Sequence, residues 1–183
     1  LRLARQEAEP RRASTAVPLA ETVVDAIGAV APLAAARGID LGLVAKVEAE
    51  ALGDREDFRT LFETLLENAV RYTPEGGTVD VEMRDEPGGT AILVRDTGPG
   101  IPPHALPRVF ERFFRVDGQA AEGSGLGLAI ADLIARRHRL ALSLTNRPDT
   151  RGAEARVLVP ASLRVAAEHM SVSTGRGPTA LPE

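Results

Sequence analysis

The sequence contains no cysteine, and this absence excludes several classes of site. Without thiols the chain can form no disulfide, carries no cysteine nucleophile and offers no cysteine ligands to zinc. Aromatic residues make up only 3% of the 183 residues, and the net charge of -4 provides no basic field for nucleic acid. We therefore expect no nucleic-acid partner.

Lysine is nearly absent as well, because Lys46 is the only one and the other basic side chains are arginines. A P-loop requires a lysine directly after its glycines, and Lys46 lies in an apolar run without glycines at that spacing, so a P-loop is excluded. Apolar runs such as residues 126–131 are too short to cross a bilayer, and no signal peptide is visible. Because the chain begins at Leu1, we expect a soluble piece of a longer protein whose membrane segments lie elsewhere.

Hydrophobic periodicity predicts the elements of one domain. Apolar residues at helical spacing predict three main helices, at residues 19–36, 54–72 and 127–138. Alternating patterns predict about five strands, at residues 39–45, 78–84, 90–95, 140–145 and 155–159. Since helices and strands follow one another in mixed order, the sequence predicts an α+β fold, a two-layer α/β sandwich with a mixed sheet, and not a doubly wound fold.

The segments around this domain differ in composition. Residues 1–10 have helical spacing up to Pro10, and residues 11–18 read as a linker with a short extended piece near Val17. The domain itself is predicted to span residues 19–160, and the small and polar residues of 161–183 predict a weakly ordered tail. Within the domain, the connection 101–122 is longer than most loops, which favours a functional role.

An asparagine in the middle of the second predicted helix is the first candidate for chemistry. Thr64, Asn68 and Arg71 are spaced to share one face of that helix. Asparagine is a poor interior residue for a helix, because its amide competes for backbone hydrogen bonds. Asn68 is either a satisfied amide at the edge of the apolar stripe or an oxygen ligand for a hard cation, with Arg71 available to a phosphate.

Two glycine-containing segments supply further candidates. Asp96 ends an apolar strand, and Gly98 and Gly100 follow it, which suits either a simple turn or the close approach of a flat ring whose amine donates to the carboxylate. Residues 123–127 carry three alternating glycines directly before a helix. Their spacing is not that of a dinucleotide-binding fold, but the N-terminus of a helix binds anions through its free N–H groups.

In this order and spacing, four segments resemble the conserved boxes of bacterial sensor histidine kinases. Residues 65–74 (LLENAVRYTP), 96–101 (DTGPGI), 110–115 (FERFFR) and 123–128 (GSGLGL) are similar to the N, G1, F and G2 boxes of that family. The resemblance covers residues 17–160 and implies the catalytic ATP-binding domain and fold shared with gyrase-like ATPases. Residues 1–10 also resemble the end of the second dimerisation helix of such kinases.

The resemblance implies a site for ATP and Mg²⁺. Asn68 would coordinate the Mg²⁺ that bridges the phosphates, Arg71 would contact phosphate, and Tyr72 would lie against the adenine. Asp96 would accept a hydrogen bond from the adenine amino group. The other residues that the resemblance places at the nucleotide or in a lid over it are Gly98, Gly100, Ile101, Phe110, Phe113, Phe114, Gly123, Ser124, Gly125, Leu126, Gly127 and Leu128.

The activity implied is transfer of the γ-phosphate of ATP to a histidine of the dimerisation domain of the same kinase, with a cognate response regulator as the next partner. The parent protein would be membrane-anchored, with this domain on the cytoplasmic side. The alternatives are an ATPase of the wider superfamily and a catalytically silent nucleotide-binding module. Thr64 stands where those ATPases carry a glutamate base, and on a helix of 3.6 residues per turn we expect Glu63 and Glu67 to point away from the site.

Two further positions depart from the family pattern. The phospho-accepting histidine is missing, since His104, His138 and His169 lack the neighbours that it requires. Arg139 follows the third helix where family members often have a glycine with positive φ. Either the arginine adopts that conformation at a cost of about 1 kcal/mol, or the helix ends with a different C-cap.

Overall fold

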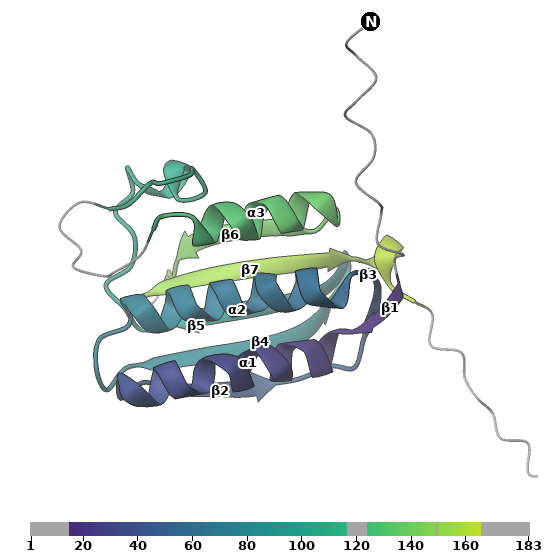
Figure 1. Cartoon of the computed structure of the whole chain (residues 1–183), viewed down its shortest axis with the longest axis horizontal. Helices are drawn as coiled ribbons and strands as arrows, with labels where there is room; N and C mark the ends of the chain where they lie inside the picture. The colour runs from purple at the N-terminus through teal and green to yellow at the C-terminus, as the bar shows by residue number, and fades with distance from the viewer. Residues whose placement is uncertain (1–14, 117–123, 149, 166–183) are drawn as a thin grey trace, which may run out of the picture.

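The computed structural model describes residues 15–116, 124–148 and 150–165, which form a single sandwich of helices on a sheet. Figure 1 labels the elements in chain order. They are β1 Thr15–Pro18, α1 Leu19–Ala36, β2 Asp40–Ala45, β3 Glu50–Gly53, α2 Arg55–Tyr72, β4 Thr78–Glu86, β5 Gly89–Asp96, the 3-10 helix η1 Leu106–Arg108, α3 Gly127–Arg137, β6 Ala141–Asn146, β7 Ala153–Pro160 and the 3-10 helix η2 Ala161–Leu163.

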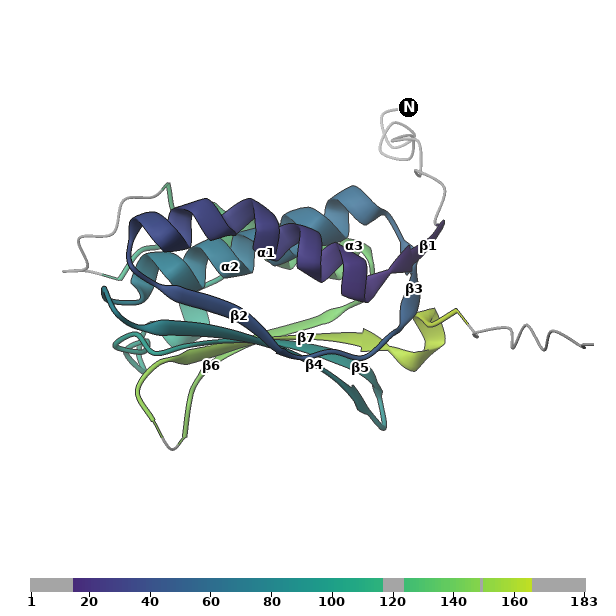
Figure 2. The same cartoon turned by 90° about the horizontal axis from the view of Figure 1, so that it is seen from below.

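The main sheet has five strands in the order β2-β4-β5-β7-β6. The β2–β4 pair is parallel and the other three pairs are antiparallel, so the sheet is mixed. All three α-helices cover the same face of this sheet (Figure 2). The predicted α+β sandwich with three helices and a five-stranded mixed sheet is therefore confirmed.

Helix α2 forms the centre of the helical layer. Its sequence specifies both the residue at which it starts and the face that it buries. The Asp54 side chain caps it by accepting hydrogen bonds from the N–H groups of Glu56 at 2.9 Å and Asp57 at 3.3 Å. Its apolar stripe meets α1, α3 and the sheet to form the core. The stripe consists of Phe58, Leu61, Phe62, Leu65, Leu66, Ala69 and Val70, all buried.

The sequence predicts no segment long and apolar enough to cross a membrane, and helix α1 is an exception to this prediction. By length and composition this helix passes that test, the only one to do so in the described part of the chain. In the structure it is a core helix: its residues Leu19, Val23, Ala26, Val30 and Ala34 are buried against α2 and the sheet. A helix that is apolar on its exposed side as well as its buried side satisfies a composition test without spanning a bilayer.

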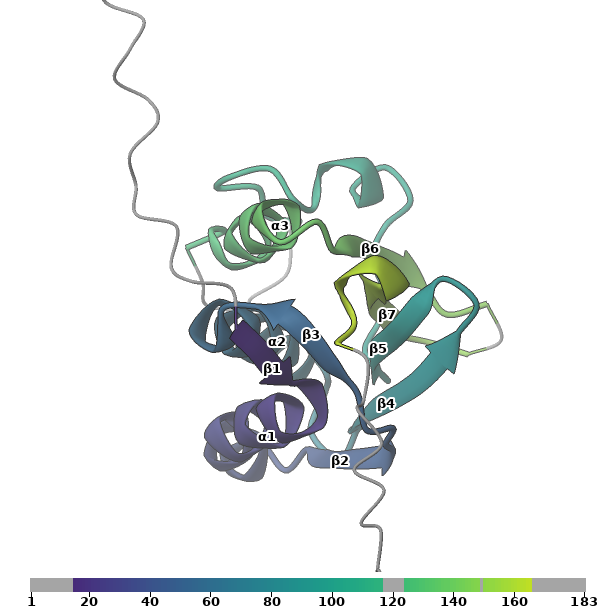
Figure 3. The same cartoon turned by 90° about the vertical axis from the view of Figure 1, so that its right-hand side faces the viewer.

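A second, two-stranded sheet lies at the end of the molecule where the described chain begins and ends (Figure 3). Strand β1 pairs antiparallel with β3, which was not predicted from the sequence. The other edge of β3 receives the end of the chain, since Ala51 bridges Arg164 and the N–H of Val165 donates to the Glu50 carbonyl at 3.0 Å. Residues 15–18 are thus part of the fold and not of a linker, and residues 161–165 are ordered and not part of a weakly ordered tail. Residues 1–14 and 166–183, with the expected dimerisation helix end, lie outside the described residues.

Candidate functional site

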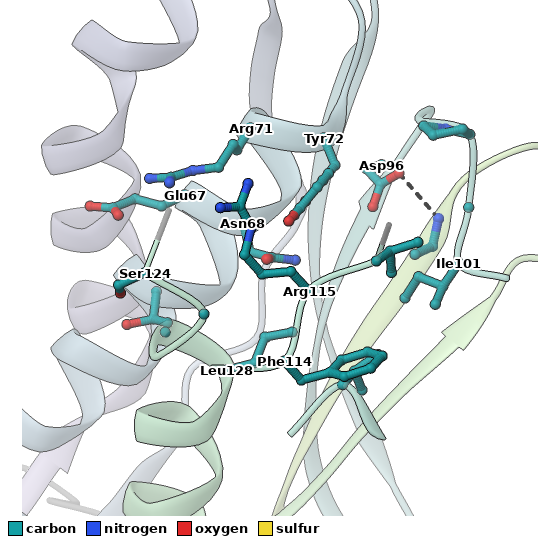
Figure 4. A pocket seen from close by; sticks show the side chains of 18 residues that line it. Glu67, Asn68, Arg71, Tyr72, Asp96, Ile101, Phe114, Arg115, Ser124 and Leu128 are labelled. Atoms are coloured by element: carbon teal, nitrogen blue, oxygen red, sulfur yellow. Dashed lines mark hydrogen bonds between the residues drawn. The ribbon is translucent and has the colours of Figure 1, made fainter. Parts of the chain in front are cut away.

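A cavity of about 230 Å³ opens where α2, the loop after β5 and the start of α3 converge. Figure 4 shows Asp96 and Ile101 on one side of this pocket, with Arg71, Glu67 and Ser124 on the other. Most of the predicted site residues line it, although they come from four separate segments of the sequence. These are Asn68, Arg71, Tyr72, Asp96, Gly100, Ile101, Phe114, Ser124, Gly125, Gly127 and Leu128.

Four predicted residues do not line the pocket, namely Gly98, Phe110, Phe113 and Leu126. Gly98 lies behind the wall, where a Cβ would come within 2.7 Å of the Tyr72 carbonyl oxygen. The Phe113 side chain faces solvent, with 71% of its surface exposed. Gly123 lies outside the described residues.

Asp96 is the buried charged group of the pocket, with 8% of its surface exposed. Its Oδ1 accepts hydrogen bonds from the N–H groups of Gly98 at 2.8 Å and Ala153 at 3.1 Å. Burial raises the pKa of Asp96 above its ordinary value, although both of these hydrogen bonds and the charge of Arg147 act in the opposite direction. Since both bonds use Oδ1, Oδ2 remains for a ligand that donates a hydrogen bond.

The last turns of α2 form the opposite wall. Thr64, Asn68 and Arg71 all line the pocket, as their spacing predicts, but Glu67 lines it too. The expectation that Glu67 points away is therefore wrong. Residues three and four apart on a helix are neighbours, so position 67 falls within the same stripe as 64, 68 and 71. This wall combines a carboxylate, an amide and a guanidinium.

The start of α3 brings backbone donors to the pocket. Gly127 opens this helix beside α2, and a Cβ on it would lie 3.3 Å from the Thr64 methyl carbon. Leu126, at the N-cap, makes no side-chain cap, which leaves first-turn N–H groups available to an anion. Arg115, which the sequence analysis did not single out, adds a second guanidinium to the lining. The pocket thus has a positive side near α3 and a carboxylate at Asp96.

A backbone hydrogen bond links two parts of the loop between β5 and α3. The N–H of Phe113 donates to the Gly125 carbonyl at 2.9 Å, and a Cβ on Gly125 would lie 2.8 Å from the Phe113 Cα. Both residues have positive φ, +63° at Phe113 and +70° at Gly125. Next to this tie, the Arg108 guanidinium stacks 4.4 Å from the centroid of the Phe114 ring. The Phe114 ring thus packs against Arg108, while the Phe113 side chain is exposed to solvent.

The site also contains residues that the sequence did not point to individually. Pro99, which lies within the segment 96–101, and Val109, Val116 and Ala153 also line the pocket. Ala153 is a small residue on β7, far along the chain, and only the pairing of β7 with β5 places it beside Asp96. Such a contact depends on strand register, which the sequence pattern does not specify.

The two described histidines do not line the pocket. His104 is exposed, and His169 lies outside the described residues. His138 ends α3 with its Nε2 2.7 Å from the Asp57 Oδ2 and its ring edge-on to Phe58 at 5.0 Å. These contacts make His138 part of the packing between α2 and α3. Among the described residues, no group of three or more histidine, aspartate and glutamate side chains could hold a metal without help from a ligand.

Comparisons with known proteins identify relatives of this chain. The family model described as "Histidine kinase-, DNA gyrase B-, and HSP90-like ATPase" matches residues 53–163. The sensor protein QseC of Escherichia coli strain K12 is 46% identical over 97 residues, which are 53% of this chain and 20% of that protein. This chain thus spans only a small part of that relative's length.

Solved structures show the same fold. The mycobacterial sensor histidine kinase MprB superposes with a TM-score of 0.72 at 29% identity, over 80% of this chain and 97% of that chain. Full-length ShkA in complex with AMPPNP superposes with a TM-score of 0.68 at 27% identity, over 82% of this chain and 33% of that chain. The second of these structures contains a bound ATP analogue.

Proposed function

The chain belongs to the family of histidine kinase-, DNA gyrase B- and HSP90-like ATPases, as the ATP-binding catalytic domain of a sensor histidine kinase, and on this premise we propose that it transfers the γ-phosphate of Mg-ATP to a histidine on a separate dimerisation domain. The observation that carries the proposal is the polarity of the pocket. A buried carboxylate, Asp96, lies on one side, while Arg71, Arg115 and the start of α3 lie on the side that suits phosphates.

The residues present fit Mg-ATP. The Asp96 Oδ2 accepts from the adenine amino group, and Gly100 and Ile101 lie along the ring. The Asn68 amide oxygen is a hard ligand of the kind that Mg²⁺ takes, and Glu67 stands one residue away. A site with so few protein oxygens suits a metal that keeps its water and phosphate ligands, as Mg²⁺ does with nucleotides. When bound, the metal neutralises phosphate charge.

Positioning and charge neutralisation carry the transfer, because phosphoryl transfer asks for little covalent chemistry from the protein. Arg71 and Arg115 hold the phosphates while the bond between the γ-phosphorus and the β–γ bridging oxygen breaks, ADP leaves, and a nitrogen–phosphorus bond forms on the acceptor. The acceptor must come from outside, since neither described histidine lines the pocket.

An apolar surface beside the pocket mouth suits the domain that brings this histidine. Phe113, next to the loop tie, and Ile130 and Leu133 on α3 are 71%, 43% and 52% exposed. Large apolar side chains exposed near one another mark interaction sites, so we assign this surface to the dimerisation helices. By the same proposal a response regulator takes the phosphoryl group from the histidine, and the parent protein is anchored in a membrane with this domain on its cytoplasmic side.

The test is to mix this chain with Mg-ATP and a matching dimerisation domain and to measure acid-labile phosphohistidine. We expect labelling that requires both proteins. An Asn68→Asp variant should lose Mg²⁺-dependent ATP affinity by about tenfold, because one neutral oxygen ligand becomes an anion facing phosphate. Tight binding of ATP without any phosphohistidine would contradict the kinase proposal, and unchanged Mg²⁺ dependence in the variant would contradict the role of Asn68.

A second candidate function, ATP hydrolysis, is favoured by one observation, the position of Glu67 in the pocket lining. A carboxylate there could activate water where Thr64 cannot. Steady-state phosphate release by this chain alone, with a Glu67→Gln variant beside it, separates the two functions. Release that stops in the variant supports hydrolysis, whereas an equal and negligible rate in both leaves transfer as the function.

A further inference from the structure

The turn between β6 and β7 lies against the wall of the pocket that carries Asp96. Asn146, the last residue of β6, makes two hydrogen bonds to the backbone of Ile101. Its Oδ1 accepts from the Ile101 N–H at 2.7 Å, and its Nδ2 donates to the Ile101 carbonyl at 2.7 Å. One amide thus satisfies both polar groups of a residue that lines the pocket, as a neighbouring strand would.

The same turn holds the other end of this wall. The Nη1 of Arg147 donates to the Asp96 carbonyl oxygen at 3.1 Å, and the N–H of Ala153 donates to the Asp96 carboxylate at 3.1 Å. Gly152 packs so closely that a Cβ on it would lie 1.9 Å from the Asp96 carbonyl oxygen. Residues 96 and 101 are therefore both fixed from one hairpin.

The hydrogen bonds of this hairpin described above reach Asp96 and Ile101, whereas α2 and the start of α3 form the lining of the phosphate side. The two halves of the pocket thus have separate supports. We therefore expect a change in the β6–β7 turn to displace the wall that faces the base more than the α2 wall that carries Arg71.

We propose that Asn146 is a positioning residue for recognition of the nucleobase. By clamping Ile101 it fixes the loop that follows Asp96, so that the carboxylate and the apolar wall meet a flat ring at the right separation. Asn146 does not line the pocket itself and acts through Ile101. The inference rests on the proposed binding of ATP and adds the element that sets selectivity for the base.

The substitution Asn146→Asp tests this with the least change of shape. The new carboxylate still accepts a hydrogen bond from the Ile101 N–H. It cannot donate one to the Ile101 carbonyl oxygen, and its negative charge repels that oxygen. Because a hydrogen bond contributes about 1 kcal/mol, we expect ATP affinity to fall by about fivefold to tenfold. Inorganic tripolyphosphate has no base, so its contacts do not depend on Asn146. Its affinity, measured with Mg²⁺, should stay within about twofold of the wild type. Thr145→Ala, an exposed neighbour on the same strand, should change neither and serves as the matched control.

Calorimetry with both ligands gives the comparison, and two results would overturn the inference. One is an Asn146→Asp variant that binds ATP like the wild type, and the other is equal loss of affinity for ATP and tripolyphosphate. A wild-type chain that does not bind ATP would instead contradict the proposed function. For that case a ligand-free readout remains: Asn146→Ala should speed hydrogen exchange of the Ile101 amide, and unchanged exchange would show that no clamp exists.

Discussion

The surroundings of Asp96 disfavour the ionised form of its carboxyl group. Burial raises its pKa, so the ionised carboxylate lowers folding stability as pH rises through the folded-state pKa, and the folded state is favoured below the unfolded value. A carboxylate kept in such a place is typical of a functional site, because a neutral residue would be easier to bury. Its two backbone hydrogen bonds orient it without neutralising it.

We therefore expect Asp96→Asn to separate stability from function. The asparagine oxygen can still accept from the N–H groups of Gly98 and Ala153, so the free energy of unfolding at pH 7 should be unchanged or higher than in the wild type. This difference should disappear at pH values low enough to protonate Asp96. ATP affinity should fall about tenfold or more, as expected for a lost hydrogen bond to a charged group. Urea unfolding at several pH values and calorimetry with ATP measure the two effects, and lower stability at pH 7 would show that the charge is compensated.

Arg139 adopts the strained conformation, which is one of the two alternatives that the sequence leaves open. It has a φ of +57° directly after α3, and the N–H of Leu140 reaches back to the Ala135 carbonyl at 2.8 Å, as in a glycine-type helix end. Replacing Arg139 by glycine should raise the free energy of unfolding by about 1 kcal/mol. As a matched control, Arg136→Gly inside α3 should lower it by about 1 kcal/mol. Thermal unfolding of both variants distinguishes relief of strain from a general effect of glycine.

At the scale of elements, α2 and α3 are joined at the end remote from the pocket. Asp57, in the first turn of α2, accepts from His138 at 2.7 Å and from Arg137 at 3.2 Å, both at the end of α3. Burial raises the pKa of Asp57, but hydrogen bonds from His138 and Arg137 outweigh burial and hold it below its ordinary value of 3.8. The carboxylate therefore stabilises the fold above that value and loses its contribution as pH falls through the lower folded-state pKa.

We predict that Asp57→Asn lowers the free energy of unfolding at pH 7 by about 1 kcal/mol. The difference from the wild type should shrink as the pH falls below about 4, where Asp57 of the unfolded chain begins to protonate, and should disappear once the pH is below the lowered folded-state pKa. Glu56→Gln, an exposed neighbour in the same helical turn, controls for the helix dipole and should have a smaller effect. A difference that persists unchanged at pH 3 would argue against this ion pair, and ATP affinity should not change.

The elements that the sequence predicts well are those whose pattern is local. Helix α2 has a capping aspartate and a continuous apolar stripe, and its start and end differ little from the expected range. Strand β3 was missed because Glu50–Gly53 is short and pairs with β1 through contacts far apart in sequence. In the site, Asn68 and Asp96 carry a chemical signal, while Ala153 and Asn146 become relevant only through strand pairing. Glu67 was misjudged because the pocket covers a wider arc of α2 than a single row of residues.

At the scale of the whole molecule, apolar side chains are exposed on more than one face, and they are not equivalent. Ile130 lies three residues beyond Gly127, which lines the pocket, and is 43% exposed, whereas Val24 on α1 lies in a separate helix and is 49% exposed. We predict that Ile130→Glu reduces phosphohistidine formation on a dimerisation domain by about tenfold, as for an apolar contact central to an interface. ATP affinity should stay unchanged, since Ile130 does not line the pocket.

Val24→Glu is the matched control, because it places the same charge on a side chain of similar exposure. It should leave both ATP affinity and phosphohistidine formation as in the wild type. Radiolabelled transfer assays at limiting dimerisation domain give the comparison. Equal loss in the two variants would mean that a general effect of charge, and not the surface beside the pocket, determines transfer.

The attachment of the described chain to both edges of β3 has a mechanical consequence. The chain enters through β1 and leaves through Arg164 and Val165, and both segments are held on this four-residue strand. A pulling force applied between residues 15 and 165 would therefore load the β3 ladders first, at the opposite end of the molecule from the pocket (Figure 1). Stretching or rotating the flanking chain would turn the domain as a rigid body about β3, and the geometry of the pocket would be preserved while its direction changes.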